Sequence, residues 1–257
     1  MSLTAPWSAL PDQPLHNPPA LSARSVAEQQ PLVTSMEQAR EAQRSLTRAG
    51  LNIVGELLRG EGPFYQLDHY PADDVFDAES HAQYYYHAHR EAEHGHFHTF
   101  VRRPAIPPSI RPATGLVRSE PWPQGDAELA HLICISMDAW GNPQGLFAVN
   151  RWVTDESWYS AADTIALLDR FQIGHARPNL AINRWLTHFI AAHRPHIEQL
   201  LRHRDEVIAR WQRVHPQVDV LEDRRLEITG YLPIDPHYWP TSDGPAKATD
   251  RQPAPSY

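Results

Sequence analysis

The chain has 257 residues, a formal net charge of -8 with its histidines neutral, and one cysteine, Cys134. This length is enough to bury a sizeable core. The acidic balance argues against nucleic-acid binding, and one cysteine excludes an intramolecular disulfide and cysteine-rich zinc or iron–sulfur sites. No apolar run approaches the roughly 18 residues of a membrane span, and the first residues lack the pattern of a secretory signal. We therefore expect a soluble, cytoplasmic protein.

Proline-rich segments at both ends, residues 1–32 and 240–257, predict disordered tails. They offer too little apolar surface to offset the entropy of ordering. Residues 33–239 are expected to form a single α+β domain, in which a small antiparallel sheet of two hairpins is packed by several helices.

The first predicted helix runs from about Ser35 to Arg59. The segment Ser35-Met-Glu-Gln38 has the form of a capping box, and Gly60 suits the C-terminal end. Apolar residues recur between these points at helical spacing, which predicts core packing. Gly50 weakens the middle by about 1 kcal/mol, so a break there is compatible with the pattern.

The next segment contains five histidines within twelve residues, at positions 87, 89, 94, 96 and 98. His87 and His89 are two residues apart, as are His96 and His98, which is the spacing of one face of a β-strand. The polar segment 90–95 predicts a turn between them. With His89 opposite His96, and His87 opposite His98, all four imidazoles share one face, with opposed Cβ atoms about 5 Å apart. The pattern predicts a metal site on a β-hairpin.

The alternative for this face is an exposed polar surface, or a network of hydrogen bonds from the imidazoles to water and backbone. Against it, a buried imidazole without a partner costs about 1–3 kcal/mol. Clustered imidazoles also resist protonation, and the neutral form is the one that binds a metal. Three ligands with an open position are typical of a catalytic site, whereas four that close the shell are typical of a structural site.

Residues near the histidine pairs extend the candidate site. Glu93 and His94 lie in the predicted turn and are further candidate metal ligands. Tyr85 shares the face of His87, where it would either donate a hydrogen bond to a substrate or pack as an ordinary aromatic residue.

A proline-rich crossing over residues 104–123 predicts a long loop or an active-site cover. A second hairpin follows, with strands at 130–137 and 146–153 and turn chemistry between them. Its apolar strands predict a sheet covered on both faces. His131 would join the metal site if its strand pairs with the first hairpin, and would otherwise cap the strand or lie exposed. Cys134 is interpreted as a small core residue.

Arg151 is unusual in an apolar strand, and we expect it to pair either with Asp155 or with an anionic substrate. Asp138, Asp155 and Glu156 are candidates to orient a ligating imidazole. Tyr85, Arg151 and Glu156 are therefore the candidate catalytic residues.

The remaining sequence predicts helices. Thr154 or Asp155 would cap a helix to about Phe171, Pro178 would open another, and Pro195 would start a third that ends near Val214. Residues 218–231 leave the choice between strand and irregular structure open. The histidines of the long C-terminal helices are expected at the surface.

The run His87-Ala-His89-Arg-Glu-Ala-Glu93 resembles the first motif of the cupin family. That resemblance implies a β-barrel on which His87, His89 and Glu93 bind iron, manganese or zinc. The following glycine is absent at its usual spacing, and Ala148 stands where the second motif has a histidine. The long C-terminal helices are also foreign to a cupin, so we interpret the match as convergence.

Two longer segments, Glu93-His-Gly-His-Phe-His-Thr-Phe100 and Asn150-Arg-Trp-Val-Thr-Asp-Glu156, resemble an uncharacterised bacterial protein family. That resemblance implies no particular activity.

These patterns together favour a metal-dependent enzyme with a divalent transition metal, either iron, copper or zinc. We lean towards a non-haem iron or copper oxidoreductase acting on a small-molecule substrate, without nucleic-acid or membrane partners. One alternative is a non-catalytic protein that binds a metal or a small ligand, and another is a histidine-rich interaction surface without metal. The oligomeric state stays open.

Overall fold

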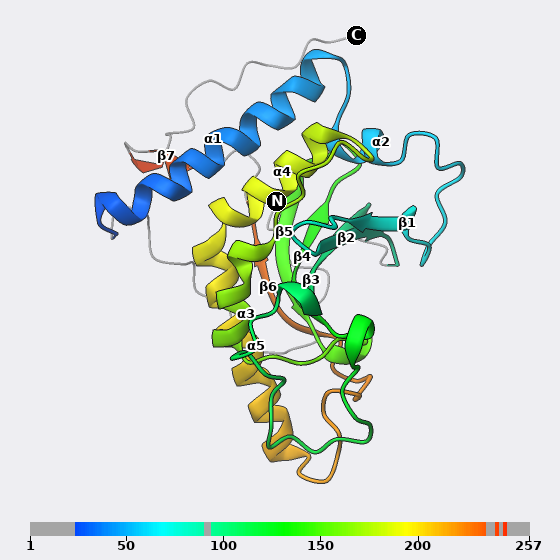
Figure 1. Ribbon diagram of the computed structural model, residues 1–257, viewed down its shortest axis with the longest axis vertical. Coiled ribbons are helices and arrows are strands. Elements are labelled where there is room, and N and C mark those ends of the chain that lie inside the picture. The colour runs from blue at the N-terminus through cyan, green and yellow to red at the C-terminus, as the bar shows by residue number, and fades with distance from the viewer. Residues whose placement is uncertain (1–23, 90–93, 235–239, 242–243, 246–257) are drawn as a thin grey trace, which may run out of the picture.

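The computed structural model describes residues 24–89, 94–234, 240–241 and 244–245. Within these residues, six strands form one antiparallel sheet in which every strand pairs with its neighbours in sequence (Figure 1). The strands are β1 Tyr70–Phe76, β2 Ala82–His87, β3 Gly95–Arg102, β4 Leu129–Met137, β5 Pro143–Val149 and β6 Ile228–Pro233. A separate pair, β7 Pro240–Thr241 with β8 Gly244–Pro245, lies near the C-terminus.

The described residues also form five α-helices, and the predicted α+β class is confirmed. They are α1 Val26–Arg48, α2 Ile53–Leu57, α3 Ala161–Leu167, α4 Leu180–Ala192 and α5 Arg194–Val214. Short 3₁₀ turns occur at Arg103–Ala105, Gly125–Ala127, Arg151–Val153 and Leu168–Arg170. The connection from β5 to β6 contains α3, α4 and α5, whereas the earlier strands follow one another without an α-helix between them.

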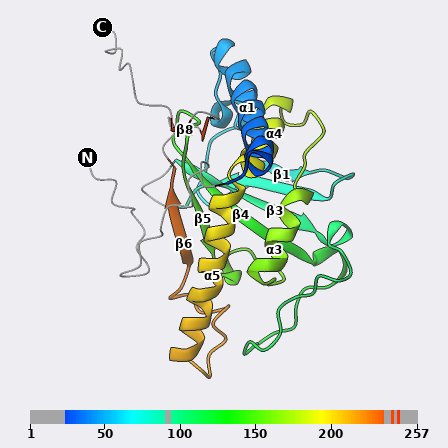
Figure 2. The same cartoon turned by 90° about the vertical axis from the view of Figure 1, so that its left-hand side faces the viewer.

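The helices lie on one face of the sheet (Figures 1 and 2). Buried side chains of β2 and β3 pack on this side against α4, with the rings of Phe97 and Trp185 6.0 Å apart. Tyr84 donates a 2.6 Å hydrogen bond to Asn183 Oδ1 on the same helix. Because side chains alternate along a strand, the neighbouring residues of β2 and β3 point to the opposite face. That opposite face carries the histidines.

The first helix differs from the prediction at both ends. It begins at Val26, where Ser25 and Glu28 form the capping box, and Ser35 lies inside it. Val26–Leu32 are therefore helical rather than part of a disordered tail. Pro31 removes one backbone donor, but the helix continues because the adjacent Leu32 and the later Met36 are buried. At the other end, Gly50 adopts a φ of +72° and separates α1 from α2.

The second hairpin is confirmed as β4 and β5, although β5 ends at Val149 and Arg151 lies in a 3₁₀ turn. The next helix begins only at Ala161, capped by Ser160 instead of Thr154 or Asp155. The helix after Pro178 and the restart at Pro195 are confirmed as α4 and α5. The region left open at 218–231 ends in strand β6.

Candidate metal centre

The two histidine strands pair two residues out of the predicted register. His87 is opposite His96, and Tyr85 is opposite His98. The connection is longer than predicted because the chain leaves the ladder after His87, where Ala88 accepts a 2.9 Å hydrogen bond from Leu67 N. A shift of two residues keeps each side chain on its predicted face. The shared face is therefore confirmed for His87, His96 and His98, whereas His89 lies beyond the end of β2 and its predicted pairing with His96 is wrong.

Three imidazoles of this face converge on their Nε2 atoms. The Nε2 of His87 is 2.9 Å from that of His96 and 3.1 Å from that of His98, and the third side of the triangle is 3.0 Å. The ring centroids are farther apart, at 4.6, 4.8 and 4.9 Å, so the rings point inward. Interplanar angles of 60–79° leave the rings fanned around a common point.

Hydrogen bonds alone cannot account for this triangle. Each Nε2 presents either one N–H or one lone pair to its neighbours. With three nitrogens and two kinds of group, at least two nitrogens are alike in any choice of tautomers. At least one of the three contacts therefore joins two N–H groups or two lone pairs at about 3 Å. A cation in front of three lone pairs removes this conflict.

The triangle also indicates which coordination geometry it fits. An ion about 2.0–2.1 Å from each nitrogen would have nitrogen–ion–nitrogen angles of about 90–100°. These angles are closer to one face of an octahedron than to the tetrahedral angle. Three neighbouring octahedral positions leave the opposite three for other ligands.

The triangle is buried among aromatic rings. His96 and His98 are fully buried and His87 is 8% exposed. Tyr85 stacks on His98 at 4.9 Å, and Phe147 of β5 meets the His96 ring edge-on at 5.1 Å. The rings around the triangle are therefore largely aromatic and apolar.

Strand β4 adds two more side chains to this face. Ile133 pairs with Thr99 and His131 pairs with Phe100, so Leu132 is an extra residue in the ladder. This extra residue places both His131 and Cys134 beside His98, although an odd spacing along a regular strand would separate them. His131 Nε2 is 3.2 Å from His98 Nδ1, and Cys134 Sγ lies 3.3 Å from His98 Nδ1 and 3.4 Å from His131 Nε2.

Comparison with known proteins places the chain in a family. The model of the family described as a domain of unknown function, DUF6969, matches residues 33–234. The chain belongs to the DUF6969 family. The predicted membership of an uncharacterised family is thereby confirmed, and the matched region contains all six strands of the main sheet. Neither the curated proteins nor the solved structures contain a match to this chain.

Glu156 lies next to the candidate metal centre and contacts the backbone of His131. Its Oε2 accepts a 2.6 Å hydrogen bond from the His131 backbone N–H. Burial raises the pKa of the Glu156 carboxyl to about 7, opposed by the charges of Arg204 and Arg151 and by the hydrogen bonds from His131 and Thr154. Burial likewise lowers the pKa of His131 to about 3, which leaves that imidazole neutral.

Tyr85 and His89 stand at the edge of the triangle. Tyr85 is sandwiched between His98 and His69, whose ring stacks on it at 3.6 Å. The His89 ring is half-buried and meets the rings of His87 and His96 at 5.0 and 5.1 Å. The catalytic role of Tyr85 stays a prediction, and so does the role of His89 as a metal ligand.

Other predicted site residues lie elsewhere in the DUF6969 fold. His94 stacks on Phe64, and its Nδ1 is 2.9 Å from the hydroxyl of Tyr86, which belongs to the helix-covered face. Arg151 donates to the Glu156 carbonyl at 2.9 Å and forms ion pairs with Asp155 and Glu222. Of the two predicted partners of Arg151, Asp155 and an anionic substrate, the structure shows the ion pair with Asp155. Glu93 lies outside the described residues.

Cys134 is a buried core residue, as predicted, and its thiol also contacts two imidazoles. One further group lies in a different environment from the one predicted. The helical His193, expected at the surface, is only 4% exposed, and burial lowers its pKa to about 3. The sequence does not reveal that Leu132 is an extra residue in the ladder. The odd spacing of His131 and Cys134 therefore did not indicate that they share a face.

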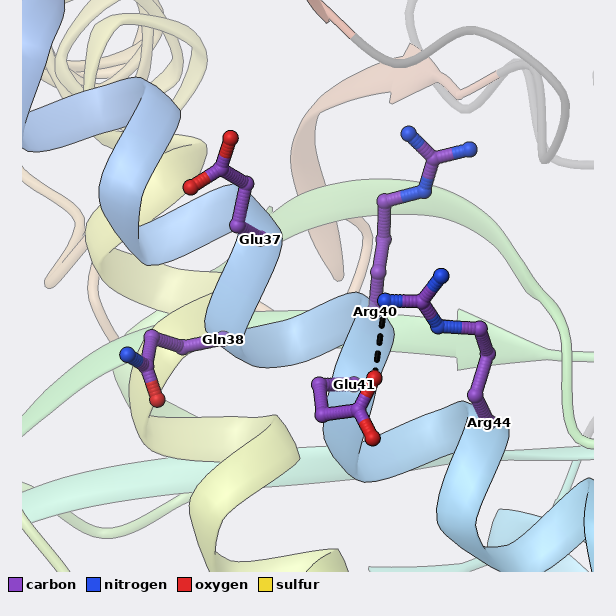
Figure 3. Close-up of a pocket in the computed structure, with 5 residues that line it drawn as sticks. All are labelled: Glu37, Gln38, Arg40, Glu41 and Arg44. Carbon is purple, nitrogen blue, oxygen red and sulfur yellow. Dashed lines mark ion pairs between the residues drawn. The ribbon is translucent and has the colours of Figure 1, made fainter.

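A hollow of about 550 Å³ on the outer face of α1 is lined by charged and polar side chains. They come from neighbouring turns of the helix, and Glu41 pairs with Arg44 at 2.7 Å (Figure 3). Both partners are more than half exposed. Such a pair contributes at most about 1 kcal/mol, and the hollow has the character of a solvated helix surface. Among the described residues, no helix has the length and apolar character to cross a lipid bilayer.

Proposed function

We propose that this protein is a metal-dependent enzyme whose ion is held by His87, His96 and His98. The observation that supports the proposal is the Nε2 triangle with sides of 2.9–3.1 Å. Such a triangle leaves at least one repulsive contact unless a cation accepts the lone pairs. Neutral imidazoles in a buried, aromatic setting are the state in which nitrogen ligates a metal.

Among iron, copper and zinc, the angles favour iron. Structural and catalytic zinc prefers tetrahedral ligands. Three ligands on one octahedral face with open positions opposite, most often two histidines and one carboxylate, are typical of non-haem Fe(II) oxygenases. The proposed activity is accordingly a non-haem iron oxidoreductase that acts on a small-molecule substrate in the cytoplasm. The protein side chains would hold the ion, exclude bulk water and orient the substrate at the open side.

A non-catalytic metal-binding protein is the second candidate, and the position of His89 supports it. Its ring lies within about 5 Å of two members of the triangle. If His89 supplies a fourth nitrogen, fewer positions stay open for a substrate. A pH-dependent interaction surface has less support, because His96 and His98 are fully buried.

Elemental analysis tests the site. The protein is purified without a nickel column, stripped of metal and reloaded anaerobically with Fe(II), and then desalted. We expect at least one equivalent of iron in the wild type and in the His94→Ala control, whose histidine lies in the same hairpin but on the other face. His96→Ala should lose the ion held by the triangle. Less than about a tenth of an equivalent in the wild type would contradict the proposal.

Nitric oxide then separates the two candidate functions. It binds Fe(II) only at an open or exchangeable position and gives a characteristic half-integer-spin electron paramagnetic resonance signal. We expect this signal from the iron-loaded wild type. Bound iron without the signal would support the closed, non-catalytic site. The signal should also persist in His89→Ala if His89 is outside the coordination shell.

A further inference from the structure

The second cluster on this face, His98, His131 and Cys134, shares only His98 with the site of the proposed function. We propose that it is a second metal site, and that the His98 imidazole bridges two ions through its two ring nitrogens. The bridging part of this inference rests on the proposed function, because it requires an ion on Nε2 of His98. The second site itself does not.

The distances fit a metal with two nitrogens and one sulfur. The three donor atoms are 3.2, 3.3 and 3.4 Å apart. With nitrogen at about 2.0–2.1 Å and sulfur at about 2.3 Å from an ion, the angles at the ion are about 100°. This value lies within the range of a distorted tetrahedron. Because thiolate and imidazole together suit zinc and copper, we assign one of these two metals to the second site.

The surroundings favour an ion over an inert thiol. Cys134 and His98 are fully buried and His131 is 3% exposed, so bulk water does not reach the three donors. The extra residue at Leu132 brings His131 and Cys134 to one side of β4, at the cost of a regular ladder. Such irregularities occur often next to functional sites. Two imidazoles and one thiol, from strands β3 and β4, thus meet at one point of the sheet.

Proton balance follows from the ligand atoms. Neutral His98 has one ring proton and the Cys134 thiol has one S–H proton. When both His98 nitrogens and the Cys134 sulfur bind ions, these two protons leave to solvent. His131 binds through Nε2 and keeps its proton on Nδ1. No oxidation or reduction takes part in assembling the site.

The alternative is a ring of hydrogen bonds. His98 Nδ1–H would donate to Cys134 Sγ, and the S–H would donate to His131 Nε2. His131 and Cys134 would then only position the His98 ring. This arrangement predicts no sulfur–metal bond, and an optical probe can distinguish it from the proposed site.

Cobalt(II) is that probe, because a thiolate bound to it gives an intense near-ultraviolet charge-transfer band. Metal-free wild-type protein is titrated with Co(II), and bound cobalt is counted after desalting. We expect two equivalents and the sulfur band. His87→Ala, which disables only the triangle, should keep one equivalent and the band. Cys134→Ser and His131→Ala should lose the band and keep the triangle's ion, and His94→Ala should match the wild type.

The outcomes separate the two proposals. One equivalent without a sulfur band in the wild type overturns the second site while leaving the triangle intact. A band with one equivalent that survives His87→Ala supports the second site and refutes the triangle. Circular dichroism of each variant verifies folding, and the wild-type titration decides the question even if a variant fails to fold.

Discussion

Replacing His96 by leucine tests whether the triangle is built for an ion. His96 occupies the corner that lies 2.9 Å from His87 Nε2 and 3.0 Å from His98 Nε2, and it is fully buried. Leucine fills a similar volume and removes one of the three nitrogens. The remaining pair, 3.1 Å apart, can then form an ordinary hydrogen bond.

The expected effect depends on metal. Without metal, the loss of ring packing against Phe147 is offset by removal of the repulsive contact, so the free energy of unfolding should change by no more than about 1 kcal/mol. With an ion at about 1,000 times its dissociation constant, the wild type gains about 4 kcal/mol. In a protein of this size each kcal/mol raises Tm by about 2–4 °C. The wild type should therefore gain about 8–16 °C from the triangle's ion.

The assay is thermal unfolding of the wild type, His96→Leu and the His94→Ala control, each with chelator and with saturating Fe(II) under anaerobic conditions. The leucine variant should lose the metal-dependent rise in Tm, and the control should keep it. Two results would refute the reasoning. One is a metal-dependent rise that survives in His96→Leu. The other is a metal-free variant destabilised by more than about 3 kcal/mol, because the His96 imidazole would then be satisfied without an ion.

Three further predictions concern the surroundings of the site. A Cβ at Gly95 would lie 2.6 Å from the ring carbon and hydroxyl of Tyr86, so Gly95→Ala should lower the free energy of unfolding by about 1–3 kcal/mol in urea titrations. The pKa of Glu156 is raised to about 7, so the folded state binds its proton more tightly than the unfolded state and this group destabilises the fold as pH rises from 4.5 through 7. The wild type should lose about 2–3 kcal/mol relative to Glu156→Gln between pH 5 and pH 8. An unchanged difference between the two proteins would contradict the burial argument. Arg151→Met should lower stability by about 2–3 kcal/mol through lost hydrogen bonds to Glu156 and Glu222, with unchanged metal content; a loss of bound metal would show that the arginine acts on the site.

The face of the site could be predicted because strand periodicity survives an error in register. Histidines two residues apart share a face wherever the turn lies, and a slip of two residues preserves that face. The slip itself could not be predicted, since it depends on the hydrogen bond from Leu67 to Ala88, which joins the hairpin to a distant loop.

Strand β1 was not predicted from the sequence. Its segment contains Pro71 and two aspartates, residues that are depleted in strands. It lies at the edge of the sheet, where a proline is tolerated because one side of the strand needs no hydrogen bond. Tertiary context also decided the start of α1, because both Ser25 and Ser35 precede an acid or amide at capping-box spacing and only Ser25 caps the helix.

The single residue Leu132 has a consequence for reading the relatives of this chain. Upstream of it, odd positions of the strand face the imidazoles, and downstream of it even positions do so. A relative without this residue would have its histidine two positions before the cysteine in a regular strand, and both side chains would still lie on the histidine face. A relative that kept the three-residue spacing but lost the irregularity would turn its histidine towards the helices. Both His-x-Cys and His-x-x-Cys spacings can therefore bring the two donors together, and only the longer spacing requires an extra residue in the ladder.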